Sequence, residues 1–107
     1  MTKRVYLAGP MSGYDDFNFH AFDLAAEELR EKGYHVFSPA ENDFLRYGDD
    51  FLQHPHRYDP RKTMADDTRW ICEYADAIAL MPGWEKSKGV KVEKALAEFL
   101  NLEIIYL

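Results

Sequence analysis

Four short apolar runs alternate with segments of helical period, and this alternation constrains the fold more than any other feature of the chain. The first three runs end at Gly9-Pro10, Ser38-Pro39 and Pro82-Gly83. Continuous apolar runs of this length are typical of strands buried on both faces. Strands that alternate with helices predict an α/β fold with an open, mostly parallel sheet of about four to five strands. The four predicted strands are Val5–Ala8, Tyr34–Phe37, Ala77–Met81 and Glu103–Tyr106.

Three helices are predicted between the strands. The first is capped by Asn18 and stopped by Gly33. The second begins at Asp59-Pro60, and the third begins near Lys88 or Gly89. Their expected apolar faces are Phe22, Ala25, Ala26 and Leu29 in the first, Met64, Trp70, Ile71 and Tyr74 in the second, and Val92, Ala95, Leu96 and Phe99 in the third.

The region from Ala40 to Tyr58 fits this scheme least well. It is polar, rich in aromatic residues and without a sustained period, although Asp43–Tyr47 could form one or two helical turns. Long irregular insertions in compact domains are often binding loops or lids. The region is therefore interpreted either as a mobile cover over a site or as an ordered surface excursion.

Length and charge limit the classes of function. A chain of 107 residues is expected to form a single domain over residues 1–107. Its formal charge of −6 argues against a nucleic-acid polymer as partner. One cysteine, Cys72, cannot form an intramolecular disulfide, and no segment approaches the ~20 apolar residues that span a bilayer. We expect a cytoplasmic protein without a membrane partner.

The residues that follow each strand are the candidates for a site, because ligands of open parallel sheets bind beyond the carboxyl ends of the strands. Gly9–Gly13 follows the first strand and could bind an anion, although it lacks the spacing of a dinucleotide or P-loop motif and a tight structural turn would explain it equally well. After the third strand, Ser87 could cap a helix whose free amides bind an anion, aided by Lys86 and Lys88. Glu93 lies one turn further on. An ordinary capped helix with a solvated glutamate is the alternative.

Three sequence blocks together resemble a known group of enzymes. They are Val5-Tyr6-Leu7-Ala8-Gly9-Pro10-Met11-Ser12-Gly13, then Ala75-Asp76-Ala77-Ile78, then Ser87-x-Gly89-x-x-x-Glu93 before Ala95. In this order they resemble the nucleoside 2-deoxyribosyltransferase superfamily over nearly the whole chain. The short phage- and prophage-type members of unassigned function are the most similar, and 2'-deoxynucleoside 5'-phosphate N-hydrolases are similar too. The resemblance implies a flavodoxin-like or Rossmann-like three-layer sandwich.

The resemblance also implies catalytic roles. Glu93 would be the nucleophile that attacks the anomeric carbon and forms a covalent glycosyl-enzyme. Asp67 would protonate the departing base, with Asp66 as the competing candidate, although a solvated helix face explains this pair nearly as well. Ser87, six residues before the nucleophile, stands where the phosphohydrolases have a phosphate-binding serine and the nucleoside transferases a carboxylate. A 5'-monophosphate is therefore the expected substrate.

Further residues are candidates for substrate contact or metal binding. Trp84 could stack on the base or sugar, or cover the sheet edge or a subunit interface; Tyr6 could contact the ligand or belong to the core. His54 and His56 invite a metal interpretation, but a surface loop is preferred and neither metal nor cofactor is predicted. The predicted substrate-binding residues are Tyr6, Gly9, Pro10, Met11, Ser12, Gly13, Trp84, Ser87 and Gly89.

The function predicted from the sequence is cleavage of the N-glycosidic bond of a 2'-deoxynucleoside 5'-monophosphate, by hydrolysis in preference to base transfer. Two alternatives remain open: a catalytically silent nucleotide-binding module, and an enzyme that cleaves a ribosyl bond in NAD or a related dinucleotide. The resemblance further implies a homodimer or larger homo-oligomer. The base and the acceptor are not fixed by the sequence.

Overall fold

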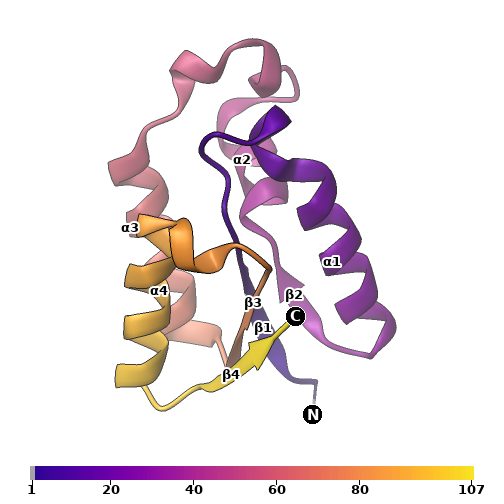
Figure 1. Cartoon of the computed structure of the whole chain (residues 1–107), viewed down its shortest axis with the longest axis vertical. Coiled ribbons are helices and arrows are strands. Elements are labelled where there is room, and N and C mark those ends of the chain that lie inside the picture. The colour runs from indigo at the N-terminus through magenta and orange to yellow at the C-terminus, as the bar shows by residue number, and fades with distance from the viewer. Residues whose placement is uncertain (1) are drawn as a thin grey trace.

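Four parallel strands form one sheet between two layers of helices (Figure 1). The computed structural model describes residues 2–107. The strand order is β2-β1-β3-β4, and all three neighbouring pairs are parallel. The predicted α/β class with a parallel sheet is confirmed, and the layers are those of a three-layer Rossmann-like fold. The strands and helices are β1 (Arg4–Ala8), α1 (Phe19–Glu31), β2 (His35–Phe37), α2 (Pro39–Tyr47), α3 (Pro60–Tyr74), β3 (Ala77–Leu80), α4 (Lys88–Phe99) and β4 (Glu103–Tyr106).

Alternate side chains of β1 point into two separate cores, one on each face of the sheet. Val5 and Leu7 pack with α1 and with Ala40 of α2. Tyr6 and Ala8 pack on the opposite face, with residues of α3 and α4. Central strands are therefore buried on both faces, as the continuous apolar runs predicted. None of the helices within residues 2–107 combines the length and the apolar character needed to cross a membrane.

The predicted helix starts are confirmed for α3 and α4. The Asp59 side chain accepts hydrogen bonds from the amides of Arg61 and Lys62, and the Ser87 hydroxyl accepts one from the amide of Val90. Asn18 occupies the N-cap position of α1 in a left-handed conformation. Its side chain makes no cap hydrogen bond and instead donates to the carbonyl oxygen of Pro10.

The region 40–58 is more regular than predicted. Its first part continues α2, and two short 3-10 turns follow at Phe51–Gln53 and Pro55–Arg57. Phe51 is fully buried and stacks against Phe17 and Tyr47. Phe51 therefore anchors the middle of this region in the core beside α1. Of the two interpretations, this favours an ordered surface excursion over a mobile cover.

Two predicted apolar faces were wrong in part. In α4, Val92 and Phe99 are 52% and 81% exposed and Ala95 is exposed too, whereas the buried positions are Val90, Glu93 and Ala97. In α3, Tyr74 is also exposed, and the buried positions are Thr63, Asp67 and Ile71. Each helix turns a carboxyl group toward the sheet, which is why the apolar pattern pointed to the wrong side.

Candidate functional site

A cavity of about 270 Å³ lies beyond the carboxyl end of β1, beside the first turns of α3 and α4. Eight of the predicted site residues line it, from three separate parts of the sequence. They are Tyr6, Gly9, Met11, Ser12, Asp67, Ser87, Gly89 and Glu93. The cavity therefore lies at the edge of the sheet where the sequence predicted a site, and both predicted catalytic carboxyl groups line it.

Glu93 is held on the inner face of α4, where it is only 7% exposed. The hydroxyl of Tyr6, on the middle of β1, donates a hydrogen bond of 2.6 Å to Oε2 of Glu93. Burial raises the pKa of Glu93 to about 8, against the opposing effect of the Tyr6 hydrogen bond. Burial and the neighbouring Glu93 carboxylate raise the pKa of Tyr6 well above its usual value, so the phenol keeps its proton and remains a donor.

Asp67 is the second buried carboxyl group of the cavity, and it is 4% exposed. Burial raises its pKa to about 6, while Arg46 and the Tyr6 hydroxyl act in the opposite direction. Its Oδ1 atom has no hydrogen-bond partner within residues 2–107. This buried atom lies 3.7 Å from Nη2 of Arg46, and the raised pKa of Asp67 allows the group to carry a proton close to neutral pH.

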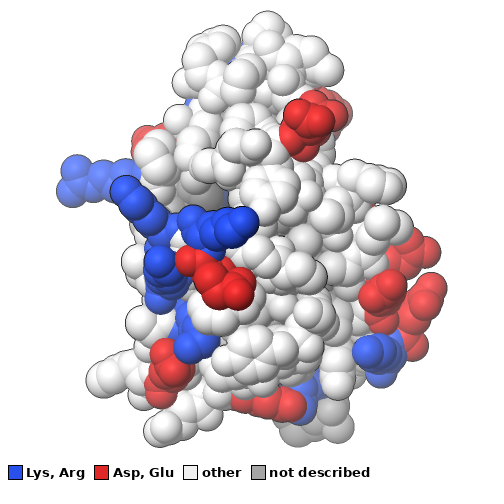
Figure 2. All heavy atoms as spheres, viewed as in Figure 1, with Lys and Arg blue, Asp and Glu red and all other residues white. Residues whose placement is uncertain are grey.

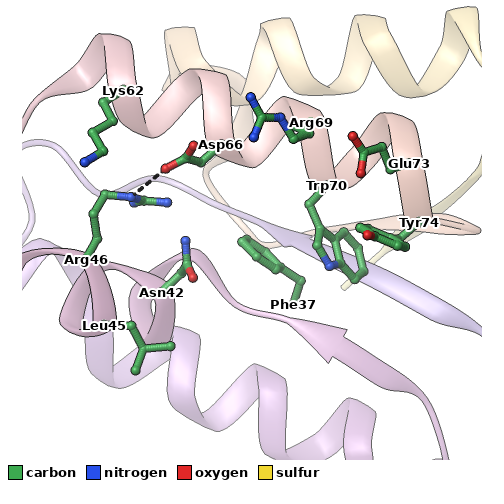
Figure 3. Close-up of a pocket in the computed structure, with 10 residues that line it drawn as sticks. All are labelled: Phe37, Asn42, Leu45, Arg46, Lys62, Asp66, Arg69, Trp70, Glu73 and Tyr74. Atoms are coloured by element: carbon green, nitrogen blue, oxygen red, sulfur yellow. Dashed lines mark hydrogen bonds and ion pairs between the residues drawn. The ribbon is translucent and has the colours of Figure 1, made fainter.

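The side chain of Asp66 does not line the cavity, which distinguishes it from Asp67, the other candidate for the general acid. Its side chain is 37% exposed and accepts a 3.0 Å hydrogen bond from Nε of Arg46. It lines a different and wider groove between α2 and α3, in which Trp70 and Tyr74 are also exposed to the opening (Figure 3). Between the two neighbours, Asp67 is the one that reaches the cavity.

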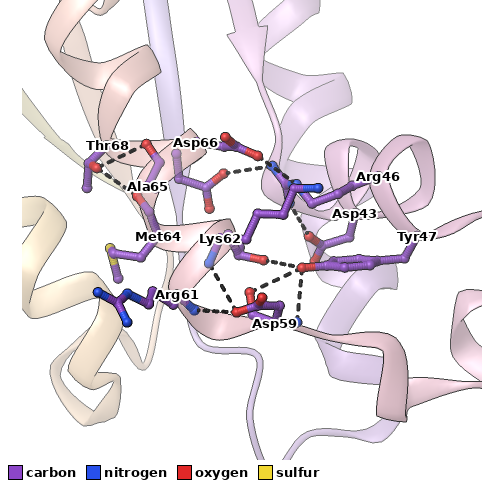
Figure 4. Close-up of polar contacts among 12 residues, drawn as sticks. Asp43, Arg46, Tyr47, Asp59, Arg61, Lys62, Met64, Ala65, Asp66 and Thr68 are labelled. Atoms are coloured by element: carbon purple, nitrogen blue, oxygen red, sulfur yellow. Dashed lines mark hydrogen bonds and ion pairs between the residues drawn. The ribbon is translucent and has the colours of Figure 1, made fainter.

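A network of charged side chains centred on Arg46 of α2 lies next to Asp67, and Figure 4 shows its members Asp43, Arg46 and Asp66. Arg46 is buried and bonds the carboxyl group of Asp43 at 3.0 Å, and its Nη2 atom lies 3.7 Å from Oδ1 of Asp67. Burial, together with the nearby Asp67 carboxylate, raises the pKa of Asp43 to about 7, although Arg46 opposes the shift. This network could not be predicted from the sequence, because Asp43 and Arg46 lie in the region that showed no sustained period.

A second cavity of about 330 Å³ adjoins the first at the start of α4. The two share Met11, Ser12, Ser87 and Gly89, and the second adds Lys86 and Lys88 to its wall. Figure 2 shows basic side chains gathered over the N-terminal ends of α3 and α4. Unpaired amides in the first turn of a helix attract anions, and these lysines strengthen the attraction.

Three predicted binding residues lie outside the main cavity. Pro10 lines only the second cavity, and Gly13 and Trp84 line neither. Gly13 adopts a positive φ of 84°, which favours glycine in a turn. Trp84 packs near Tyr106 at the end of β4, with its ring 5.3 Å from the Lys94 ammonium group. This placement corresponds to the alternative in which Trp84 covers the sheet edge.

Gly9 lines the cavity, but a packing constraint accounts for this glycine. A Cβ atom at this position would lie 2.6 Å from the sulfur of Met81 and 2.9 Å from its Cβ. Contacts that short do not occur in folded proteins, so a side chain at position 9 would displace Met81 from the core. Glycine at this position therefore permits a close approach to Met81, the residue that follows β3.

Sequence reasoning missed several residues of the cavity wall. Tyr58 comes from the end of the region 40–58, and burial and the nearby carboxylates raise its pKa. Phe22 of α1 and Thr63 of α3 also line the cavity. These side chains have no motif around them. Among residues 2–107, no group of three or more His, Cys, Asp or Glu side chains is arranged to hold a metal ion.

These features define an α/β protein in which a parallel sheet carries an acidic cavity and an adjoining basic opening at the carboxyl ends of its strands. The chain belongs to the family described as Domain of unknown function (DUF4406), whose model matches residues 3–106. No curated protein matches the chain.

Proposed function

We propose that this protein cleaves the N-glycosidic bond of a 2'-deoxynucleoside 5'-monophosphate. The observation that carries the proposal is a pair of buried carboxyl groups in one cavity, Glu93 and Asp67, of which Glu93 is hydrogen-bonded to Tyr6. A retaining glycosidase uses two such groups, one as nucleophile and one as acid. The resemblance of the sequence to the nucleoside 2-deoxyribosyltransferase superfamily supports the same roles.

In the first step a Glu93 carboxylate oxygen bonds to C1' of the deoxyribose, and the C1'–N bond breaks with its electron pair on the base. The proton of Asp67 passes to a nitrogen of the base, which leaves as a neutral molecule. In the second step water attacks C1', the glycosyl ester bond breaks, and Asp67 recovers a proton from that water. Glu93 is released as a carboxylate, and free base and deoxyribose 5-phosphate are the products.

Protonation of the pair must suit these roles. Burial raises both pKa values, so near neutral pH Glu93 and Asp67 together hold about one proton. The higher pKa of Glu93 leaves that proton mainly on Glu93, so the reactive form, with the proton on Asp67, is the minor one of the two. The Tyr6 hydroxyl favours an ionised Glu93 because it donates to its carboxylate, and the positive charge that develops on the sugar in the transition state favours it further.

The opening at α4 suits the phosphate. Ser87 places a hydroxyl at the helix start, and Lys86 and Lys88 line the same space. A phosphate there would be adjacent to the main cavity through the four residues that the two spaces share. A carboxylate at position 87 would repel a dianion, whereas a hydroxyl and helix amides attract it.

Chromatography of the bases released from a panel of deoxynucleotides and deoxynucleosides tests the proposal. The wild-type protein is expected to release base from the monophosphates, and Glu93→Gln to lose that activity by about a thousandfold or more. Glu98→Gln is the matched control, because Glu98 lies on the exposed side of the same helix and pairs only with Lys94. Equal activity in wild type and Glu93→Gln would refute the proposal.

Two further measurements separate the alternatives. Trapping the glycosyl-enzyme and mapping it by mass spectrometry is expected to place the sugar on Glu93, and a label on Asp67 would reverse the two roles. Saturable nucleotide binding without turnover across the panel would favour a silent binding module. Release of nicotinamide from NAD would favour cleavage of a ribosyl bond in a dinucleotide.

A homo-oligomeric state and a cytoplasmic location belong to the same proposal. Val92 and Phe99 expose apolar surface on α4, beside an edge strand, β4, with an exposed Tyr106. Exposed apolar groups of this kind commonly mark contact surfaces. Sedimentation velocity is expected to show a species larger than one chain, and a monomer at micromolar concentration would contradict it.

A further inference from the structure

Arg46 connects three carboxyl groups behind the candidate site. Its side chain is 7% exposed, and it meets Asp43, Asp66 and Asp67 through three different nitrogen atoms. Nη1 bonds Asp43 and Nε bonds Asp66, each at 3.0 Å. A guanidinium group has a fixed planar fork of donors, so these two bonds determine where its third nitrogen, Nη2, lies.

The third nitrogen is held just short of Asp67. Nη2 lies 3.7 Å from Oδ1 of Asp67, which is too long for a hydrogen bond. Neither of these two buried atoms has a hydrogen-bond partner within residues 2–107. A movement of less than about 1 Å would bring them to the usual hydrogen-bond distance. Two unpartnered atoms of opposite charge that face each other form an incomplete ion pair.

We propose that Arg46 is a positioning residue that holds Asp67 in place and receives the negative charge formed on Asp67 when it protonates the departing base. The inference rests on the proposed function, since it assigns a task within that reaction. A full ion pair before reaction would ionise Asp67 and leave it no proton to give. The bonds to Asp43 and Asp66 restrain the guanidinium group until the proton has left.

The charge balance follows from the same step. When the proton moves from Asp67 to the base nitrogen, Asp67 becomes a buried carboxylate, and an uncompensated buried charge is strongly unfavourable. Arg46 supplies the compensating charge without any further proton transfer. Other titratable groups also act on Asp67, from every element packed around it. They are Tyr6 of β1, Asp43 of α2, Tyr58 ahead of α3, Asp66 of α3 and Glu93 of α4.

The test compares two leaving groups. A natural deoxynucleotide needs a proton on its departing base, whereas 4-nitrophenyl 2-deoxyribofuranoside 5-phosphate releases a stable anion and needs none. Arg46→Lys is expected to slow release of the natural base by about tenfold or more and to affect the nitrophenyl substrate far less. Arg30→Met is the control, because Arg30 forms an exposed pair with Glu41 far from the cavity.

A double variant keeps the test independent of folding. Arg46→Met alone would leave the buried Asp43 without its cation, so it is combined with Asp43→Asn, which removes that charge. The double variant is expected to show a larger selective loss than Arg46→Lys. It is also expected to shift the acidic limb of kcat/KM to higher pH, because loss of the cation raises the pKa of Asp67, the lower of the two pKa values.

The outcomes separate this inference from the proposed function. An equal loss on both substrates with an unchanged acidic limb would show that Arg46 has only a structural task, while the proposed function would stand. Absence of base release and of nitrophenolate release from wild type would refute the proposed function and this inference together. Carboxyl carbon NMR of Asp67 in the same proteins is expected to show a higher pKa without Arg46, and an unchanged pKa would overturn the inference without any reference to turnover.

Discussion

Removal of one hydroxyl group, by Tyr6→Phe, perturbs the candidate site at its most constrained point. The Tyr6 hydroxyl donates a 2.6 Å hydrogen bond to Glu93, and both side chains are buried. A hydrogen bond to a charged group contributes about 1.5–3 kcal/mol, and one pKa unit corresponds to about 1.4 kcal/mol. Loss of the bond therefore raises the pKa of Glu93 further by about one to two units, since the bond favours the ionised form.

The consequence for activity depends on pH. With pKa values of about 6 for Asp67 and about 8 for Glu93, Asp67 sets the acidic limb of the pH profile of kcat/KM and Glu93 sets the alkaline limb. The alkaline limb is therefore expected to move to higher pH by about one to two units in Tyr6→Phe. Near pH 7 the variant is expected to be about 10- to 100-fold slower than wild type, and it should recover part of the difference at pH 9. Tyr34→Phe is the control, because it removes a phenol hydroxyl outside the cavity.

The measurement is the rate of base release from the best deoxynucleotide substrate between pH 5 and pH 9. An unchanged alkaline limb in Tyr6→Phe would refute the reasoning, even if the overall rate fell. A uniform loss at every pH would mean that the hydroxyl orients the substrate or the carboxylate and does not set its ionisation.

Three further predictions concern stability and specificity. Burial raises the pKa of Asp43 to about 7 from the usual 3.8, so the folded protein binds an extra proton and its free energy of unfolding should fall as pH rises from about 4 to 7. In thermal unfolding curves, Asp43→Asn should flatten that decline, and an unchanged slope would contradict the raised pKa. Ser87→Asp keeps a good helix cap but adds a negative charge at the α4 opening. Its Tm should be unchanged, while its KM for a deoxynucleoside monophosphate should rise about tenfold or more relative to its KM for the nucleoside. An equal rise in both KM values would exclude a phosphate site there. Phe51→Ala should lower the free energy of unfolding, measured with urea, by about 3–5 kcal/mol, because the side chain is fully buried. A decrease below about 1 kcal/mol would show that region 48–58 is not part of the core.

The fold could be predicted from the sequence because its central strands obey a simple rule. β1 and β3 are buried on both faces, so their apolar runs are continuous and the residues that end them mark the strand ends. The caps Asp59 and Ser87 were also readable, since their side chains act locally on amides two or three residues away. Local chemistry of this kind needs no knowledge of tertiary contacts.

The apolar face of α1 was predicted correctly, but those of α3 and α4 were not predicted in full, for a reason connected with the site. The buried position of α4 is occupied by Glu93, and the exposed side carries Val92 and Phe99. A pattern that assigns apolar residues to the core selects the wrong side of such a helix. The same failure hid α2, whose buried residues are Pro39, Ala40 and the charged Asp43. Deviations from the expected pattern coincide with the residues of the cavity and of its supporting network.

This coincidence has an energetic reason. Asp43, Asp67 and Glu93 are almost completely buried, and burial raises the pKa of each. Each is less stable as a charge inside the protein than in water, so these carboxyl groups destabilise the fold near neutral pH. Apolar residues of similar size would remove that cost and restore the helical pattern. Residues that weaken a fold where simpler ones would serve it better indicate a task other than folding. Here Asp67 and Glu93 line a single cavity, and Asp43 is connected to it through Arg46, so a ligand that neutralises or uses the charge of the two cavity residues should also stabilise the protein against heat.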